Sequence, residues 1–349
     1  MDLDAPKDSG AAMDVTEREG KVVATDRHAR GQPLVSVVTP VYNTAEYLAE
    51  CMESVLNQTY ENWEHVVVDN RSTDGSLELA RAYEARDRRV RVVAADVFVG
   101  GGENANRALR EMSTDARYCK VLHADDWLFP ECIERMVELA QSNPNVGIVS
   151  AYRLEESTVT LDGIPYSISV LSGREIARSM LLGRPYPYVF GSPSSLLLRS
   201  DLIRKRDPFY NVDNRYQHDQ EACYEVLRES DFGFVHQVLT FTRRPETAGT
   251  AFWVRVGAQL PGQIDLLLKY GPLYLEQAEF QRRLAVLLVH YGNFLLKGLP
   301  KLQDAGYRTY QRQASARLVD RVDWRDVAAG VRLQLRRMRE TRRLRPGQG

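Results

Sequence analysis

The sequence predicts an α/β protein with a mostly parallel sheet and helices on both of its faces. Four short runs rich in β-branched residues alternate with segments of helical period between residues 34 and 123, and strands that alternate with helices in this way form βαβ units. Polar residues directly follow several of these runs, where such sheets bind ligands. From about residue 254 the apolar pattern is helical only, so we expect a C-terminal helical extension.

Each strand or helix is predicted from the spacing of apolar residues within its own segment. Alternating or continuous β-branched residues predict strands, and apolar residues at i, i+3 and i+4 predict helices. In chain order the predicted elements are a strand at 34–40, a helix at 45–58, a strand at 65–70, a helix at 77–86, a strand at 90–94, a helix at 104–112, a strand at 118–123, a helix at 130–142, a strand at 146–152, a helix at 172–183, a strand at 195–198, a helix at 218–228 and a strand at 233–242.

The chain divides into three predicted parts. Residues 1–32 are rich in charged residues, Ala and Gly without an apolar period, which predicts a disordered leader. Residues 33–253 form one α/β domain, with a regular half at 33–150 and an α+β half at 151–253. Residues 254–349 form the helical extension, and its last stretch (VRLQLRRMRETRRLR) carries seven Arg against one Glu.

Composition narrows the function classes. The 46 Lys and Arg nearly balance the 47 Asp and Glu, so no nucleic-acid partner is expected. The cysteines form no CxxC pair, which favours buried thiols in a reducing cytoplasm over disulfides or zinc; they are Cys51, Cys119, Cys132 and Cys223. The N-terminus has no basic and apolar leader, and no run of 18 apolar residues occurs, so we expect neither a signal peptide nor a membrane span.

Carboxylates follow two of the predicted strands. Asp125 and Asp126 come just after the strand at 118–123. Adjacent carboxylates repel each other, and a divalent cation would remove that cost, although helix capping also explains such a pair. Asp69 ends an apolar strand, where a buried carboxylate needs a donor from a ligand or from the turn that follows. Because both motifs end strands of one sheet, we favour a ligand site at that edge.

Other motifs leave two interpretations open. Thr39 and Pro40 end the first predicted strand, and Tyr42 and Asn43 follow it; since Pro and Asn are ordinary turn residues, this segment fits either a turn or a ligand contact. Neither GxGxxG nor GxxxxGK[ST] follows that strand, so the glycines at 100–102 predict a turn before a helix. That helix could still present Asn104, Asn106 or Arg107 to a nucleotide. Asp219 begins a helix as either a cap or a general base. Arg243 and its neighbour Arg244 fit a leaving diphosphate or an ordinary basic surface.

Three segments together resemble a known family. They are VSVVTPVYNTAEYLAECMESVLNQTYENWEHVVVDNRSTDGS, NANRAL and HADDWLFP, and their order closely resembles that of glycosyltransferase family 2, the inverting enzymes with a GT-A fold. The resemblance is strong over residues 33–150 and looser over 190–250. It implies a GT-A, Rossmann-like sheet in which 33–150 binds the nucleotide sugar and 151–253 binds the acceptor.

The resemblance also implies residue roles. Thr39, Pro40 and Tyr42 would line the base pocket, and Asp69 would meet the base. Asp125 and Asp126 would be the DxD-type pair that touches the ribose and a Mn²⁺ or Mg²⁺ ion. A base role would fall to Asp219 and a diphosphate contact to Arg243, both at motif positions of the family; Asn106 is the further nucleotide contact that we expect. The chain departs from the family where it has His123 and where it has His218 before Asp219.

These expectations amount to a metal-dependent, inverting transfer of a sugar from a nucleotide sugar, which we expect to be a UDP-sugar, to a hydroxyl of a glycan or lipid-linked acceptor. Two alternatives remain open: a nucleotidyltransferase, and an inactive nucleotide-sugar-binding protein. The Arg-rich end predicts peripheral contact with the inner face of a membrane, although solvated helix ends explain it as well. We therefore expect a cytoplasmic or peripherally bound protein.

Overall fold

The computed structural model describes residues 31–322, apart from residues 187, 214–215 and 245–248. From Pro33 onward the chain forms one unit, and the description below concerns that unit. The predicted leader, except for its last two residues, and the Arg-rich end lie outside the described residues.

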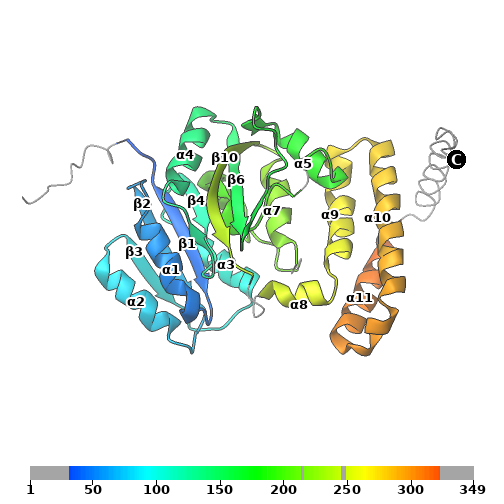
Figure 1. Ribbon diagram of the computed structural model, residues 1–349, viewed down its shortest axis with the longest axis horizontal. Coiled ribbons are helices and arrows are strands. Elements are labelled where there is room, and N and C mark those ends of the chain that lie inside the picture. The colour runs from blue at the N-terminus through cyan, green and yellow to red at the C-terminus, as the bar shows by residue number, and fades with distance from the viewer. Residues whose placement is uncertain (1–30, 187, 214–215, 245–248, 323–349) are drawn as a thin grey trace, which may run out of the picture. The chain divides into compact units, whose positions relative to one another are not determined.

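One sheet organises this unit (Figure 1). Its strands run in the order β3-β2-β1-β4-β9-β6-β10-β5, with β7 paired to β6 and β8 paired to β10. The strand bounds are β1 Val35–Val41, β2 Trp63–Asp69, β3 Val90–Ala94, β4 Tyr118–Val121, β5 Trp127–Leu128, β6 Val146–Glu155, β7 Thr158–Thr160, β8 Val170–Leu171, β9 Leu197–Arg199 and β10 Asp231–Thr242.

The first half of the sheet is parallel, as the sequence predicts. β2 lies between β3 and β1, β1 lies between β2 and β4, and all three pairings are parallel. The register places Val41 of β1 opposite Asp69 of β2. The carboxyl ends of these strands therefore meet at one edge.

Helices cover both faces. Their bounds are α1 Ala45–Leu56, α2 Ser76–Arg86, α3 Gly101–Arg110, α4 Cys132–Ser142, α5 Gly173–Leu182, α6 Ser200–Arg204, α7 His218–Val226, α8 Gly249–Arg255, α9 Gln259–Tyr274, α10 Gln277–Lys297 and α11 Ala305–Arg321, with the 3₁₀ turns η1 Pro193–Ser195 and η2 Leu299–Gln303.

The alternation of side chains along β1 assigns each face its helices. Val35 and Val37 point into a cluster with α1 and α4. Val38 points the other way, into the cluster that contains residues of α3, α5 and α7. Because successive residues of a strand face opposite sides, a run of valines buries both faces of the sheet at once.

The second half of the sheet is mixed. β9 runs antiparallel to both of its neighbours, β4 and β6, whereas β6 and β10 are parallel. Several details depart from the predicted elements, including the short α6, β7 and β8, which are not among them. α3 begins at Gly101 rather than residue 104, since its packing on β1 and β2 outweighs the weak helix propensity of glycine. β5 was not predicted because it is two residues long and pairs only with the distant β10.

The C-terminal helices extend the face that carries α5 and α7. α9 packs on α5, and α10 and α11 pack on α9 (Figure 1). Buried aromatic rings join the layers: Tyr224 of α7 stacks on Tyr270 of α9, with ring centroids 5.0 Å apart. No helix among the described residues is long and apolar enough to cross a membrane.

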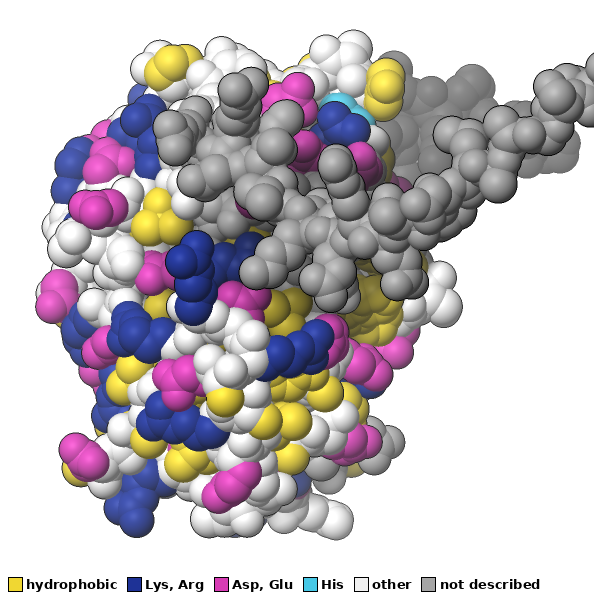
Figure 2. Space-filling model, turned by 90° about the vertical axis from the view of Figure 1, so that its left-hand side faces the viewer, with side chains coloured by type: hydrophobic (Ala, Val, Ile, Leu, Met, Phe, Trp, Pro, Cys, Tyr) yellow, Lys and Arg dark blue, Asp and Glu magenta, His cyan; other side chains and the backbone are white. Residues whose placement is uncertain are grey.

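Charges of both signs mix on the face that carries α2 and the edge strand β3 (Figure 2). Ion pairs such as Arg81 with Glu84 and Arg91 with Glu111 account for this mixture. The visible part of this face therefore carries charges of both signs.

The tight start of α5 yields a stability prediction. A Cβ on buried Gly173 would clash with the backbone carbonyl oxygens of Leu227 and Ser230, which no side-chain rotation can relieve. We expect Gly173→Ala to lower the unfolding free energy by about 1–3 kcal/mol. The control is Gly292→Ala, in the exposed middle of α10 with open space around it, which should raise it by about 0.5–1 kcal/mol. Urea unfolding of both variants measures the difference, and equal effects would refute it.

Candidate functional site

Three neighbouring strands deliver polar residues to one edge of the sheet. β1 ends at Val41 beside Asp69, the last residue of β2. β4 lies on the other side of β1 and leads directly into His123, Asp125 and Asp126. Residues more than 50 positions apart in the chain thus share the carboxyl edge of the parallel half.

A compact cluster follows β4. One potential ligand atom from each of His123, Asp125 and Asp126 lies within 4.8 Å of the others. Ser194 supports the loop, since its hydroxyl accepts a hydrogen bond from the backbone N–H of His123 at 3.0 Å. The cluster offers one imidazole nitrogen and two carboxylates, a donor set that suits a divalent cation.

Asp126 is the buried member of the cluster, with 2% of its surface exposed. Burial raises the pKa of Asp126 to about 6, and the charge of Asp125 adds to the rise while His123 acts against it. The backbone N–H of Arg243 donates to Oδ1 at 3.1 Å, and the hydroxyl of Thr242 donates to Oδ2 at 3.5 Å. Asp126 therefore holds the end of β10 against the loop after β4, which leaves the half-buried Asp125 as the more accessible carboxylate.

Asp69 is almost fully buried at the end of β2, with 1% exposed. Its Oδ2 accepts the backbone N–H of Ser72 at 3.1 Å, as a turn cap would. Its Oδ1 is buried without a hydrogen-bond donor from any described residue. The same holds for Oδ1 of Asn104 in the first turn of α3, whose amide nitrogen reaches the carbonyl oxygen of Val68 at 3.4 Å. Buried acceptors without donors are costly, so both point to a ligand that supplies N–H or O–H groups.

An aromatic pair stands at this edge. Tyr42 and Phe98 are exposed, and their ring centroids lie 4.8 Å apart. Asn70 anchors the loop that carries Phe98, since its amide exchanges hydrogen bonds of 2.7 and 3.0 Å with the backbone of Val99. The pair is an exposed aromatic surface, close in sequence to Pro40 near the end of β1.

Two predicted contacts are turned inward. The hydroxyl of Thr39 is fully buried and pairs with Nε2 of His65 at 2.9 Å. Burial lowers the pKa of that His65 ring to about 3, so the ring is neutral. The amide of Asn106 is buried and exchanges two hydrogen bonds of 2.8 Å with the backbone of Tyr210. The Thr39 hydroxyl thus has a partner within the fold, and the Asn106 amide fixes the chain ahead of α7.

Asp219 stands half-buried in the first turn of α7. Burial and then the charge of Asp219 raise the pKa of Tyr216, whereas Arg244 acts to lower it. The pKa of Arg244 in turn responds to Tyr216 and Asp126, after its main partner Glu155. Asp219 therefore acts on the pKa of Tyr216, and Arg244 is a basic neighbour of that same ring.

Arg243 points toward α1. Its guanidinium pairs with Glu50 and lies over the ring of Tyr47, 4.5 Å from the centroid. Its Nε is buried without an acceptor among the described residues. The side chain next to Asp126 is thus held in place but retains a free donor.

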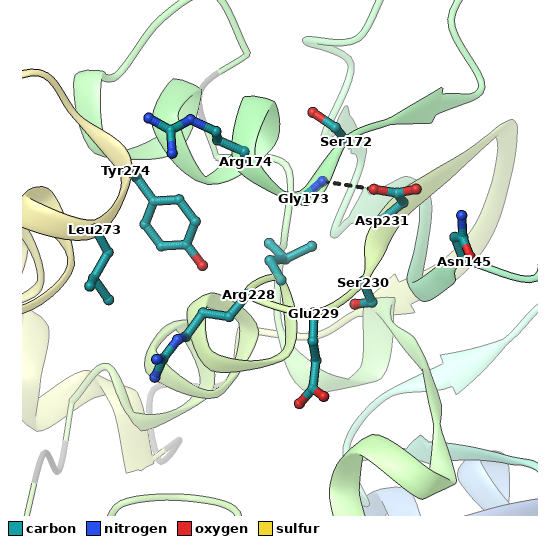
Figure 3. A pocket seen from close by; sticks show the side chains of 11 residues that line it. Asn145, Ser172, Gly173, Arg174, Arg228, Glu229, Ser230, Asp231, Leu273 and Tyr274 are labelled. Atoms are coloured by element: carbon teal, nitrogen blue, oxygen red, sulfur yellow. Dashed lines mark hydrogen bonds between the residues drawn. The ribbon is translucent and has the colours of Figure 1, made fainter.

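A cavity of about 540 Å³ lies elsewhere (Figure 3). It is lined at the amino ends of β6 and β10 by Asn145 and Asp231, and by Leu273 and Tyr274 of α9. Asp231 accepts the backbone N–H of Gly173 at 3.1 Å across its rim. None of the predicted site residues lines this cavity. Cavity volume alone would therefore not identify the candidate site at the carboxyl edge of the parallel strands.

Sequence reasoning missed two members of this site. Phe98 carries no motif, and only its exposure beside Tyr42 reveals it. His123 stood out only as a departure from the family pattern, although its spacing from Asp125 is that of a ligand cluster.

Comparisons with known proteins support a single family. A model described as glycosyl transferase family 2 matches residues 36–205. Glycosyltransferase GlyG of Streptococcus pneumoniae is 36% identical over 220 residues, which are 60% of this chain and 71% of GlyG. The putative teichuronic acid biosynthesis glycosyltransferase TuaG of Bacillus subtilis is 33% identical over 134 residues, 38% of this chain and 51% of TuaG. The chain thus spans about half of TuaG.

Solved structures share the fold. S. aureus TarS in complex with UDP-GlcNAc aligns with a TM-score of 0.61 at 17% identity, over 84% of this chain and 82% of that one. The mannosyltransferase PcManGT from Pyrobaculum calidifontis in complex with GDP-Man and Mn²⁺ aligns with a TM-score of 0.51 at 17% identity, over 81% and 84%. Both matches extend well beyond residue 205, so the likeness includes part of the second half.

The inward amide of Asn106 yields a prediction. Asn106→Ala removes two buried hydrogen bonds and leaves the backbone groups of Tyr210 unpaired. We expect the unfolding free energy to fall by about 2–3 kcal/mol, measured by urea unfolding. Unchanged stability together with lost nucleotide binding would instead support Asn106 as a nucleotide contact.

Proposed function

Because the chain belongs to glycosyl transferase family 2 and is a glycosyltransferase, we propose that it transfers a sugar from a UDP-sugar to an acceptor hydroxyl with inversion at the anomeric carbon. The proposed acceptor is a glycan, a lipid-linked saccharide or another molecule with a free hydroxyl. Residues 33–150 hold the donor, and 151–253 together with the C-terminal helices hold the acceptor.

One observation carries this proposal. The unpartnered Oδ1 of Asp69 and the cluster of His123, Asp125 and Asp126 lie at the ends of strands that flank β1. A nucleotide sugar would supply a partner for both features. Its base would donate an N–H to Asp69, and its diphosphate would bring a cation that the cluster could bind. The exposed rings of Tyr42 and Phe98 offer a stacking surface for the base, and Pro40 is close to Tyr42 in sequence.

The donor nucleotide is proposed with support from the fold neighbours. TarS is described with UDP-GlcNAc and PcManGT with GDP-Man. Uracil and guanine both present an N–H that Asp69 could accept, so Asp69 alone does not separate them. We favour uracil, as the sequence resemblance implies, and a donor panel tests the choice.

The cluster fits Mn²⁺ or Mg²⁺. Its two carboxylates and one imidazole are ligands that such ions accept. Burial raises the pKa of Asp126 to about 6, and a cation bound beside it would stabilise its charged form. We propose that Asp125 and Asp126 hold the ion, with Asp125 the more accessible. Once bound, the cation would offset the charge that develops on the departing diphosphate. Arg243 lies next to Asp126, and its free Nε–H would add a donor on that side.

The residue that we propose to activate the acceptor hydroxyl lies in α7. We propose that Asp219 accepts the proton of the acceptor hydroxyl as that oxygen attacks the anomeric carbon. The bond between the anomeric carbon and the diphosphate oxygen breaks as the new glycosidic bond forms, and its electrons leave with the diphosphate. One displacement inverts the configuration, so no covalent enzyme intermediate is needed.

The two alternatives from the sequence are less well supported. The family match and the relatives named glycosyltransferases do not favour a nucleotidyltransferase. Incubation with UDP-sugars and Mn²⁺ separates the hypotheses. Slow release of UDP supports a transferase, release of pyrophosphate supports a nucleotidyltransferase, and no release supports an inactive binding protein.

The base role has a direct test. Asp219→Asn keeps the size and the hydrogen-bonding oxygen of the side chain but removes its basicity. We expect UDP-sugar turnover to fall by about 10²- to 10⁴-fold, with donor affinity by calorimetry unchanged. Asp213→Asn, in the exposed loop ahead of α7, is the matched control and should turn over normally. If Asp219→Asn also turns over normally, the base lies elsewhere.

The metal role is tested by binding rather than by turnover. Asp125→Asn should weaken Mn²⁺ binding by more than the roughly tenfold loss that even an outer-shell change causes, measured by electron paramagnetic resonance of free Mn²⁺ with UDP present. The control is Asp115→Asn, an exposed carboxylate ahead of β4. Equal Mn²⁺ affinity in both variants would remove Asp125 from the cation site.

A further inference from the structure

The turn between α10 and α11 exposes an unusual set of side chains. Leu296, Leu299 and Leu302 have 66%, 57% and 40% of their surfaces exposed, within seven residues. Lys297 and Lys301 lie between them, exposed and without an ion-pair partner in the part of the chain that the structure describes. We call these five residues the apolar-basic turn. Exposed apolar patches of this kind mark contact surfaces.

Bases outnumber acids around the turn, although α10 contains Glu279 in its first turn and α11 contains Asp320 in its last. Between residues 280 and 319 the only acid is Asp304. Its carboxylate caps α11 and lies 3.9 Å from Arg255. The seven bases of this stretch are Arg282, Arg283, Lys297, Lys301, Arg308, Arg312 and Arg317. This excess of bases differs from the visible part of the face in Figure 2, where acidic and basic side chains are mixed.

The apolar-basic turn can be placed relative to the donor edge, by which we mean the carboxyl edge of the parallel strands where the donor site is proposed. Asp304 and Gly306 lie next to Arg255 and Phe252 of α8. α8 follows β10, whose end is bonded to Asp126. In Figure 1 the turn and the carboxyl ends of β1 and β2 lie toward the same, lower end of the unit. A surface bound by the turn would thus lie on the side where the donor site opens.

We propose that the apolar-basic turn binds an anionic phospholipid surface. Its leucines enter the boundary between headgroups and acyl chains, and its lysines contact the anionic headgroups. Between residues 280 and 319 seven bases face one acid, and this excess favours a lipid surface over a second copy of α10 and α11, since two copies would bring like charges together. A lipid-linked acceptor would then meet the donor edge at the membrane. Lipid binding does not depend on the proposed transfer reaction, so either can fail without the other.

Vesicle co-sedimentation of the full chain tests the proposal. The probes are vesicles of phosphatidylcholine alone and of phosphatidylcholine with phosphatidylglycerol. We expect binding to the anionic vesicles only, weakening as salt rises. Lys297→Ala with Lys301→Ala should reduce partitioning roughly 30-fold, and Leu296→Glu with Leu299→Glu should abolish it. Val159→Glu, an exposed apolar residue on β7, is the matched control and should bind as the wild type does.

Three outcomes would overturn the proposal. The first is equal binding by the wild type and both turn variants. The second is loss of binding only on deletion of residues 331–349, which would assign the contact to the Arg-rich end. The third is self-association of the wild type that the leucine variant abolishes while vesicle binding persists, which would identify a second copy as the partner. Thermal melting shows whether each variant is folded, and these exposed positions should leave it unchanged.

Discussion

The hydrogen bond from the backbone N–H of Arg243 to the buried carboxylate of Asp126 joins two parts of the chain that are 117 residues apart. It fixes the end of β10 against the loop after β4, so the second half of the sheet closes on the first at the edge where the proposed donor site lies. The same carboxylate sits beside Asp125 and His123 with a raised pKa, which favours a cation there. Architecture and proposed chemistry therefore depend on one side chain.

In this arrangement some polar residues stabilise the fold, and others keep polar atoms available for a ligand. Asn70, Asn106 and the Thr39 hydroxyl satisfy buried backbone and side-chain groups and so hold the loops in place. Asp69, Asn104 and Arg243 each keep a buried polar atom without a partner among the residues described. Buried atoms elsewhere, such as the hydroxyls of Ser200 and Tyr307, also lack a partner among the residues described. The three atoms named above differ in lying near the candidate site, and we interpret them as contacts for a bound molecule.

Local patterns predicted the parallel half of the sheet well. Runs of valine with the right period, and carboxylates at strand ends, are local signals that survive folding because both faces of β1 and β2 are buried. The antiparallel β9 and the two-residue β5 depend on contacts between distant segments, which no local period encodes. The sequence also did not predict Phe98 and His123 as members of the site. Their membership depends on which residues lie next to them in the folded chain. The roles of Asp125, Asp219 and Asp69 stay predictions.

The most direct test is a crystal structure of the protein with UDP and Mn²⁺. The account predicts the base against Asp69 and between the loops of Tyr42 and Phe98, with the diphosphate and the ion at Asp125. Nucleotide bound instead in the cavity at the amino ends of β6 and β10, with no density at Asp125, would contradict it.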